Sequence, residues 1–156
     1  MSTCASLRRR FRYHQWATQT LIEAAAQTDA SEVRRPLGHA LIADRVWLLR
    51  LRSEPTEGTA LWPDLEIEGC RALARRNADG YTAALDTLSE ADLDATVAYQ
   101  NSSGRTYATA IRDVLDHVLL HASHHRGQVN AALRAAGADP PWVDFIAWVR
   151  AGEPGA

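Results

Sequence analysis

Residues Thr109–Ala136 read TAIRDVLDHVLLHASHHRGQVNAALRAA, and we predict that they form one long helix. The apolar residues of this stretch recur every three or four positions, as they do on the buried face of an amphipathic helix. Four of the six histidines of the chain lie here, namely His117, His121, His124 and His125. Histidines four residues apart share one face of a helix, where two imidazoles can reach one metal ion.

Two assignments of the metal-ligating face are open. At about 100° per residue, His121 and His125 lie on or beside the arc of apolar residues that faces the core. His117 and His124 lie further toward the polar side, so the stripe His117–His121–His124–Gln128 is a second assignment. We rank His121 and His125 first, because a ligand is held most rigidly where its side chain points inward.

A third ligand must come from another part of the chain, because a catalytic zinc site usually has three protein ligands and an open position. His14 and His39 are the only other histidines. His14 lies in the apolar stripe of the first predicted helix, and we interpret it as a core or boundary residue. His39 lies in the first turn of the second predicted helix, where it is either a ligand or a structural residue bonded to a neighbouring carbonyl.

The composition excludes several classes of protein. The chain has 156 residues, of which 46% are hydrophobic and 23% charged, so we expect a single domain over residues 1–156. The net charge is −2 and the longest basic run is Arg8–Arg10, so we expect no nucleic-acid partner. No apolar run approaches a membrane span, and the N-terminus lacks a signal-peptide core. Cys4 and Cys70 are too few for a disulfide framework, so we expect a cytoplasmic protein with reduced thiols.

Apolar periodicity predicts four substantial helices, over residues 6–27, 37–52, 65–88 and 109–136, with polar connections at 28–35 and 53–64. Pro36 suits the first turn of the second helix. Thr106 or Thr109 is the expected N-cap of the fourth helix, and Gly137 its expected end.

Two further elements complete the predicted fold. Segments 95–99 and 105–108 favour strands and flank the turn-forming residues 101–104, which predicts a small two-stranded excursion. Residues 142–150 form a short fifth helix. We therefore predict an all-α fold, a four-helix bundle with a short C-terminal helix and a small β-excursion before the fourth long helix.

Three blocks of sequence resemble one known family. Residues 13–17 read YHQWA, residues 39–47 read HALIADRVW, and residues 117–128 read HVLLHASHHRGQ. In this order, and with the ending at 140–148, they resemble the DinB-like (DinB/YfiT-like) family over nearly the whole chain. The last block is the most specific. The first block departs from the family at His14, where the family often has Asn.

The resemblance implies an up-down-down-up four-helix bundle, commonly a homodimer, in which three histidines hold a divalent metal ion. Carried over by position, these ligands are His39, His121 and His125. His124 then corresponds to a packing residue or a neighbour of the site. Three imidazoles suit a divalent transition metal, with zinc first and nickel, iron, manganese or copper as alternatives.

Related members of the superfamily include thiol S-transferases and mycothiol-dependent isomerases. The resemblance therefore implies a small-molecule substrate, with a low-molecular-weight thiol among the candidates. Our first hypothesis is a metal-dependent hydrolase or thiol-type S-transferase. The alternative is a non-catalytic metal-binding or stress-related protein in which the metal is structural.

The sequence assigns no catalytic residue. We expect each ligand imidazole to donate its second N–H to a carboxylate or a carbonyl, and Asp44, Asp113 and Asp116 are the carboxylate candidates. Arg126 is interpreted as a packing or ion-pair residue.

Overall fold

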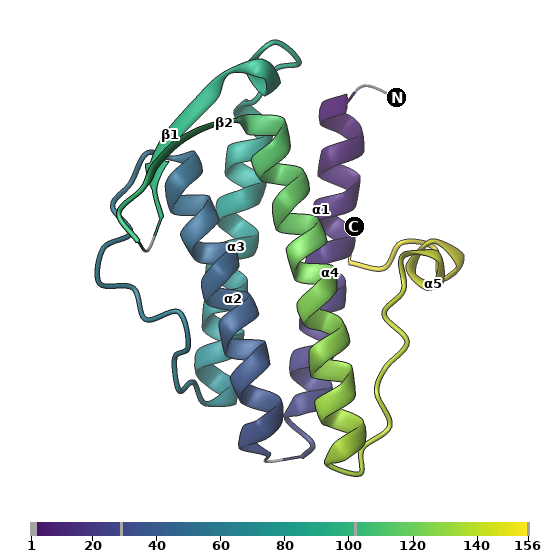
Figure 1. The fold of residues 1–156 in the computed structure, drawn as a ribbon. Coiled ribbons are helices and arrows are strands. Elements are labelled where there is room, and N and C mark those ends of the chain that lie inside the picture. The colour runs from purple at the N-terminus through teal and green to yellow at the C-terminus, as the bar shows by residue number, and fades with distance from the viewer. Residues whose placement is uncertain (1–2, 29, 102, 156) are drawn as a thin grey trace.

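The computed structural model describes residues 3–28, 30–101 and 103–155, which are mostly helical with one small two-stranded sheet. The long helices are α1 (Thr3–Ala25), α2 (Ser31–Leu51), α3 (Ile67–Thr87) and α4 (Ile111–Ala135). The shorter elements are the 3-10 turn η1 (Asp92–Asp94), strands β1 (Thr96–Gln100) and β2 (Thr106–Ala110), and helix α5 (Phe145–Arg150). The long helices lie side by side, and the antiparallel sheet leans over one end of them (Figure 1). In the part of the chain that the structure describes, no helix combines the length and the apolar content that a bilayer span requires.

Two clusters of buried apolar residues fill the interior of the bundle. The first cluster is centred on Leu21, Leu37, Leu73 and Leu133. The second cluster is centred on Phe11, Leu48, Tyr81 and Leu115. Each long helix supplies residues to both clusters, and one or two buried polar residues lie between these two sets in its sequence. The buried polar residues are His14, Asp44, Asn77, His125 and Arg126. The bundle therefore has a polar layer between two apolar layers.

The second helix begins earlier than the sequence predicted. It starts at Ser31, so most of the predicted connection over 28–35 is helical, and Asp29 of that connection lies outside the described residues. Pro36 lies inside α2 rather than in its first turn. The prediction was wrong because Val33, which is completely buried, extends the apolar face of the helix in front of the proline.

The predicted N-cap of the fourth helix was also wrong. Thr106 and Thr109 both belong to β2, where Thr109 pairs with Val97, and α4 begins only at Ile111. The N–H of Ile111 donates to the carbonyl of Ala95 at 2.9 Å, so the sheet supplies an acceptor at this end of the helix.

The C-terminal end of α4 and the two-stranded excursion agree with the predictions made from the sequence. Gly137 has a φ of +78°, and its N–H donates to the Arg134 carbonyl, which confirms that it ends the helix. The backbone of Asn101 bonds to that of Arg105 at 2.9 Å across the turn between the strands, of which Ser102 lies outside the described residues. The short last helix spans 145–150 instead of 142–150.

Gly80 on α3 permits a close approach to α2, which yields a test of the packing. A Cβ at position 80 would overlap the Cδ2 methyl of Leu48, which is fully buried. We expect Gly80→Ala to lower the free energy of unfolding by about 1–3 kcal/mol, because overpacking outweighs the gain of about 1 kcal/mol in helix propensity.

Gly127 on α4 is the matched control, since a Cβ there would meet no atom within 4 Å. Gly127→Ala should raise the free energy of unfolding by up to about 1 kcal/mol. Urea unfolding at pH 7 measures both variants. Equal stabilisation by the two alanines would contradict the contact between Gly80 and Leu48.

Candidate metal centre

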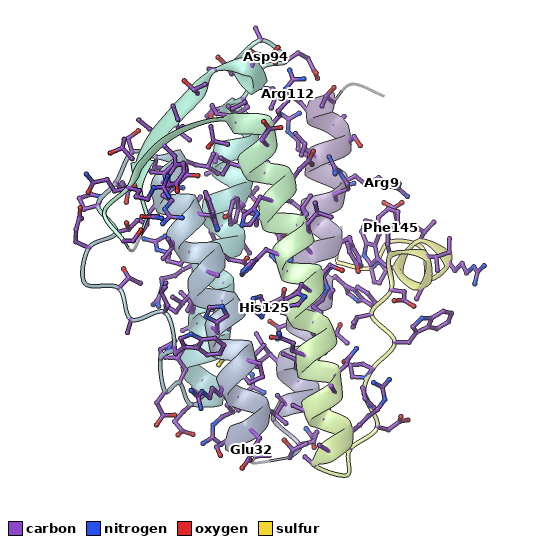
Figure 2. All side chains as sticks on the ribbon, viewed as in Figure 1. Arg9, Glu32, Asp94, Arg112, His125 and Phe145 are labelled. Carbon is purple, nitrogen blue, oxygen red and sulfur yellow. The ribbon has the colours of Figure 1, made fainter. Side chains whose placement is uncertain are left out.

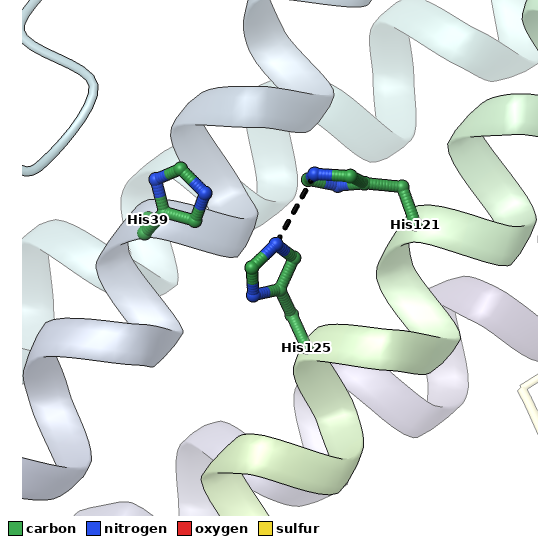
Figure 3. A group of neighbouring side chains, drawn as sticks. All are labelled: His39, His121 and His125. Carbon is green, nitrogen blue, oxygen red and sulfur yellow. Dashed lines mark hydrogen bonds between the residues drawn. The ribbon is translucent and has the colours of Figure 1, made fainter.

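Three histidine side chains from two helices converge between α2 and α4. His39 comes from α2, whereas His121 and His125 come from successive turns of α4, and the three rings point toward one another (Figure 3). One nitrogen atom of each ring lies within 4.8 Å of the other two. Nε2 of His121 and Nε2 of His125 are 3.1 Å apart. Two nitrogens bound to one tetrahedral zinc ion lie about 3.3 Å apart, so this spacing suits a shared ion.

The histidines of the second assignment do not form such a group. His117 and His124 are exposed, and neither belongs to the group of three nitrogen donors. His125 is only 6% exposed and lies between α2 and α4, about halfway along the bundle (Figure 2). The structure therefore agrees with the prediction, made from the helical angles, that His121 and His125 point inward. Metal binding by the group stays a prediction.

Hydrogen bonds fix the protonated nitrogen in two of the three rings. Nδ1 of His39 lies 2.7 Å from the carbonyl oxygen of Leu61, and a carbonyl only accepts. Nδ1 of His125 lies 2.7 Å from Oε1 of Gln128, whose amide nitrogen contacts His124. Both rings therefore carry their proton on Nδ1 and keep a lone pair on Nε2, as a metal ligand requires.

The environment also keeps the imidazoles of His121 and His125 neutral. Burial, together with the neighbouring rings of His125 and His117, lowers the pKa of His121 to about 4. Burial likewise lowers the pKa of His125. A neutral imidazole is the form that binds metal, so these two histidines could bind a cation near pH 7 without first losing a proton.

The predicted carboxylate acceptors for these rings were wrong. Asp44 bonds to His14, Asp116 pairs with Arg10 at 2.9 Å, and Asp113 is exposed. A backbone carbonyl and the Gln128 amide take this role instead. Gln128 could have been found from its position one turn after His125, whereas nothing in the sequence marks the carbonyl of Leu61.

His14 belongs to a separate buried hydrogen-bonded chain. Nη1 of Arg126 lies 3.2 Å from Nδ1 of His14, and Nε2 of His14 lies 2.9 Å from Oδ2 of Asp44. Because a guanidinium only donates, Nδ1 of His14 accepts and its Nε2–H donates to the carboxylate. Both nitrogens of His14 are thus engaged, in agreement with its interpretation as a core residue. Arg126 is buried in the same chain, as a packing residue.

A cavity of about 670 Å³ opens beside the histidine group. It is lined by His39 and His121, by the loop between α2 and α3, and by the turn between β1 and β2. The indole of Trp62 from that loop stacks on the His39 ring with 3.9 Å between the ring centres. The volume is in the range of small-molecule binding sites.

Comparison with models of protein families matches residues 4–155 to the DinB family. The chain therefore belongs to the DinB family, and the resemblance carried by its three sequence blocks is confirmed. Neither the curated proteins nor the solved structures include a match to the chain.

The chain Arg126–His14–Asp44 yields a test of stability. Asp44→Ala removes the carboxylate and leaves the Arg126 charge and the His14 N–H buried without an anion. We expect the free energy of unfolding to fall by about 3 kcal/mol or more. Asp79→Ala is the control, because Asp79 is exposed on α3 and its removal should change stability by less than about 0.5 kcal/mol. Urea unfolding at pH 7 compares the two, and a small effect of both would contradict the buried chain.

Proposed function

We propose that this DinB-family protein is a metal-dependent enzyme that acts on a small molecule, as a hydrolase or a thiol-type S-transferase. The metal ligands in this proposal are His39, His121 and His125. The observation that carries it is the convergence of three imidazole nitrogens within 4.8 Å, at the edge of a cavity of about 670 Å³.

The donor set fits a divalent transition metal. Neutral imidazoles suit zinc, nickel, copper or iron, and zinc is our first choice with manganese as a further alternative. An ion held here would supply a Lewis acid that favours the deprotonated form of a water or a thiol. The protein's own part is to hold the ligands: Gln128 and the Leu61 carbonyl orient two rings, and Trp62 covers one face of His39.

The composition of the group favours catalysis over a purely structural metal. In residues 3–28, 30–101 and 103–155, no fourth histidine, cysteine or carboxylate joins the three nitrogens. Structural zinc sites usually have four protein ligands, whereas catalytic sites have three and leave one position for water or substrate. The adjoining cavity gives a substrate access to that position.

We also propose that the long helices form the up-down-down-up bundle. Two hydrogen bonds support it: the Asn77 amide donates to the Leu41 carbonyl, and the Tyr81 hydroxyl donates to the Asp44 carbonyl. Residue numbers rise together along the two helices, as they do when α2 and α3 run in the same direction. The homodimer, the cytoplasmic location and the thiol partner stay predictions.

Removal of a ligand tests the metal site. We expect about one metal ion per chain in the purified protein, and none in His121→Ala or His125→Ala, because two imidazoles on separate helices bind an ion far more weakly than three. His124→Ala is the matched control on the same helix, since His124 is exposed and outside the group. Elemental analysis measures the metal content. Full occupancy in the two ligand variants would refute the assignment.

Activity separates the two reactions. The metal-loaded protein is screened with activated esters and, separately, with low-molecular-weight thiols in the presence of electrophiles. Turnover that disappears in His121→Ala and persists in His124→Ala supports catalysis at the group. A protein that binds its metal but turns over neither set with zinc, nickel, iron, manganese or copper would instead support the structural alternative.

Gln128 is expected to strengthen metal binding through His125. Gln128→Leu removes the acceptor for Nδ1–H of His125 and should weaken metal affinity by about 10–100-fold. Gln128→Glu keeps an acceptor oxygen at the same place and should retain the affinity. Competition with a chromophoric chelator measures both variants, and equal affinities in the two would show that the hydrogen bond does not matter.

A further inference from the structure

Arg50 lies on the same wall of the cavity as His39, further along α2. Arg50 follows His39 by eleven positions, which brings it to within about 20° of the same direction around the helix axis and advances it by about 16 Å along that axis. Both side chains line the cavity, and the lining residues of α2 between them are Ala43, Val46 and Trp47. One apolar strip of α2 thus leads from the histidine group to a cation.

The guanidinium of Arg50 is held in place by neighbours from two elements. It lies over the ring of Trp47 at 4.5 Å and over the ring of Tyr99 in β1 at 4.7 Å. One of its N–H groups donates to the carbonyl of Gln100 at 3.3 Å. These cation–π contacts and this hydrogen bond pre-organise the side chain at the cavity wall, which lowers the entropic cost of binding a ligand there.

Within the described part of the chain, the positive charge of Arg50 has no anionic partner. Among the described residues no carboxylate forms an ion pair with it, whereas all four arginines of α1 have such partners. Glu57 also lines the cavity, but it is exposed on the loop and is not paired with Arg50. The Nε atom of Arg50 is buried without a hydrogen-bond partner.

Because Arg50 is partly buried, an anionic ligand would interact with it more strongly than with an exposed arginine. Burial lowers the pKa of Arg50, because the charged guanidinium has lost part of its water. Arginine nevertheless stays charged in proteins, so an anion would offset the part of the desolvation cost that the aromatic rings and the Gln100 carbonyl do not. Hydrogen bonds between a guanidinium and a carboxylate are stronger than neutral ones and match the planar fork of the side chain.

We propose that Arg50 binds a carboxylate of the substrate, and that the protein therefore acts on elongated small molecules with an acid at one end and an apolar body. The body would lie along Ala43, Val46 and Trp47, and the reacting group would reach the three histidines. The position of the reacting group rests on the proposed function, whereas carboxylate binding at Arg50 does not. A single arginine matches one carboxylate rather than a polyanion.

A pair of probes with the same shape tests the carboxylate site. The metal-loaded protein is titrated with 4-phenylbutanoate and with its neutral analogue 4-phenylbutanamide, by calorimetry. The acid should bind the unmodified protein about tenfold more tightly than the amide, because only the acid gains a charge-assisted hydrogen bond. In Arg50→Gln the ratio of the two dissociation constants should fall to near one.

Arg35→Gln is the matched control variant. Arg35 also lies over a tryptophan, Trp62, at 5.6 Å, but it does not line the cavity, so its removal should leave the ratio unchanged. Circular dichroism checks the fold of each variant. Arg50→Met, whose side chain still covers the Trp47 ring, makes the same comparison if the glutamine variant unfolds.

The outcomes separate the two proposals. An acid preference that persists in Arg50→Gln and Arg50→Met would place the carboxylate elsewhere, for example on the metal, and would overturn the role of Arg50. Equal binding of acid and amide to the unmodified protein would overturn it as well. Metal content, measured on the same samples, should be unchanged in the Arg50 variants. A metal-free unmodified protein would refute the proposed function and leave the test of Arg50 intact.

Discussion

The buried hydrogen-bonded chain from Arg126 through His14 to Asp44 joins three of the long helices between the two apolar clusters. If one helix slid by a turn, a charged or polar member would enter an apolar layer without its partner, at a cost of several kcal/mol. The apolar contacts on either side tolerate small shifts far better, because dispersion and burial are not directional. This polar layer therefore fixes the register in which α1, α2 and α4 pack. His125 directly precedes Arg126, so the register also fixes where the histidine group forms.

The relative positions of the three histidines are set in two different ways. His121 and His125 are one turn apart on one helix, so their relative position follows from helix geometry alone. His39 depends on the packing of α2 against α4, and its ring is oriented by the Leu61 carbonyl and the Trp62 ring of the following loop. His39 thus connects the core of the bundle to the loop that lines the cavity. A displacement of this loop would remove the two contacts that orient the His39 ring.

The sequence predicted those features that depend on local periodicity, and it missed those that depend on distant backbone. The inward face of His121 and His125 followed from the angle per residue, and Gly137 followed from its freedom at positive φ. His39 remained ambiguous until the resemblance of whole blocks was considered. The start of α4 was misplaced because Thr109 pairs with Val97 in a sheet, a competition that no capping preference reveals. A carboxylate or a carbonyl was expected beside each of these rings, but nothing in the sequence shows that the carbonyl of Leu61 in the following loop takes this role for His39.

The loop after α2 and the two-stranded sheet both line the cavity, and neither would be stable alone. The two-stranded sheet is too small to fold by itself, and it is held against α2 through the contacts of Tyr99 with Trp47 and Arg50. The contact of Tyr99 with Arg50 also holds the guanidinium that we propose to bind the carboxylate of the substrate. On this proposal the long helices hold the metal ligands, while the loop after α2 and the sheet shape the space that a substrate enters. Connections tolerate changes of sequence better than a packed core does, since few buried contacts depend on them. On this proposal, a change in the walls of the cavity would change the substrate, while the polar layer, the register and the three histidines stay as they are.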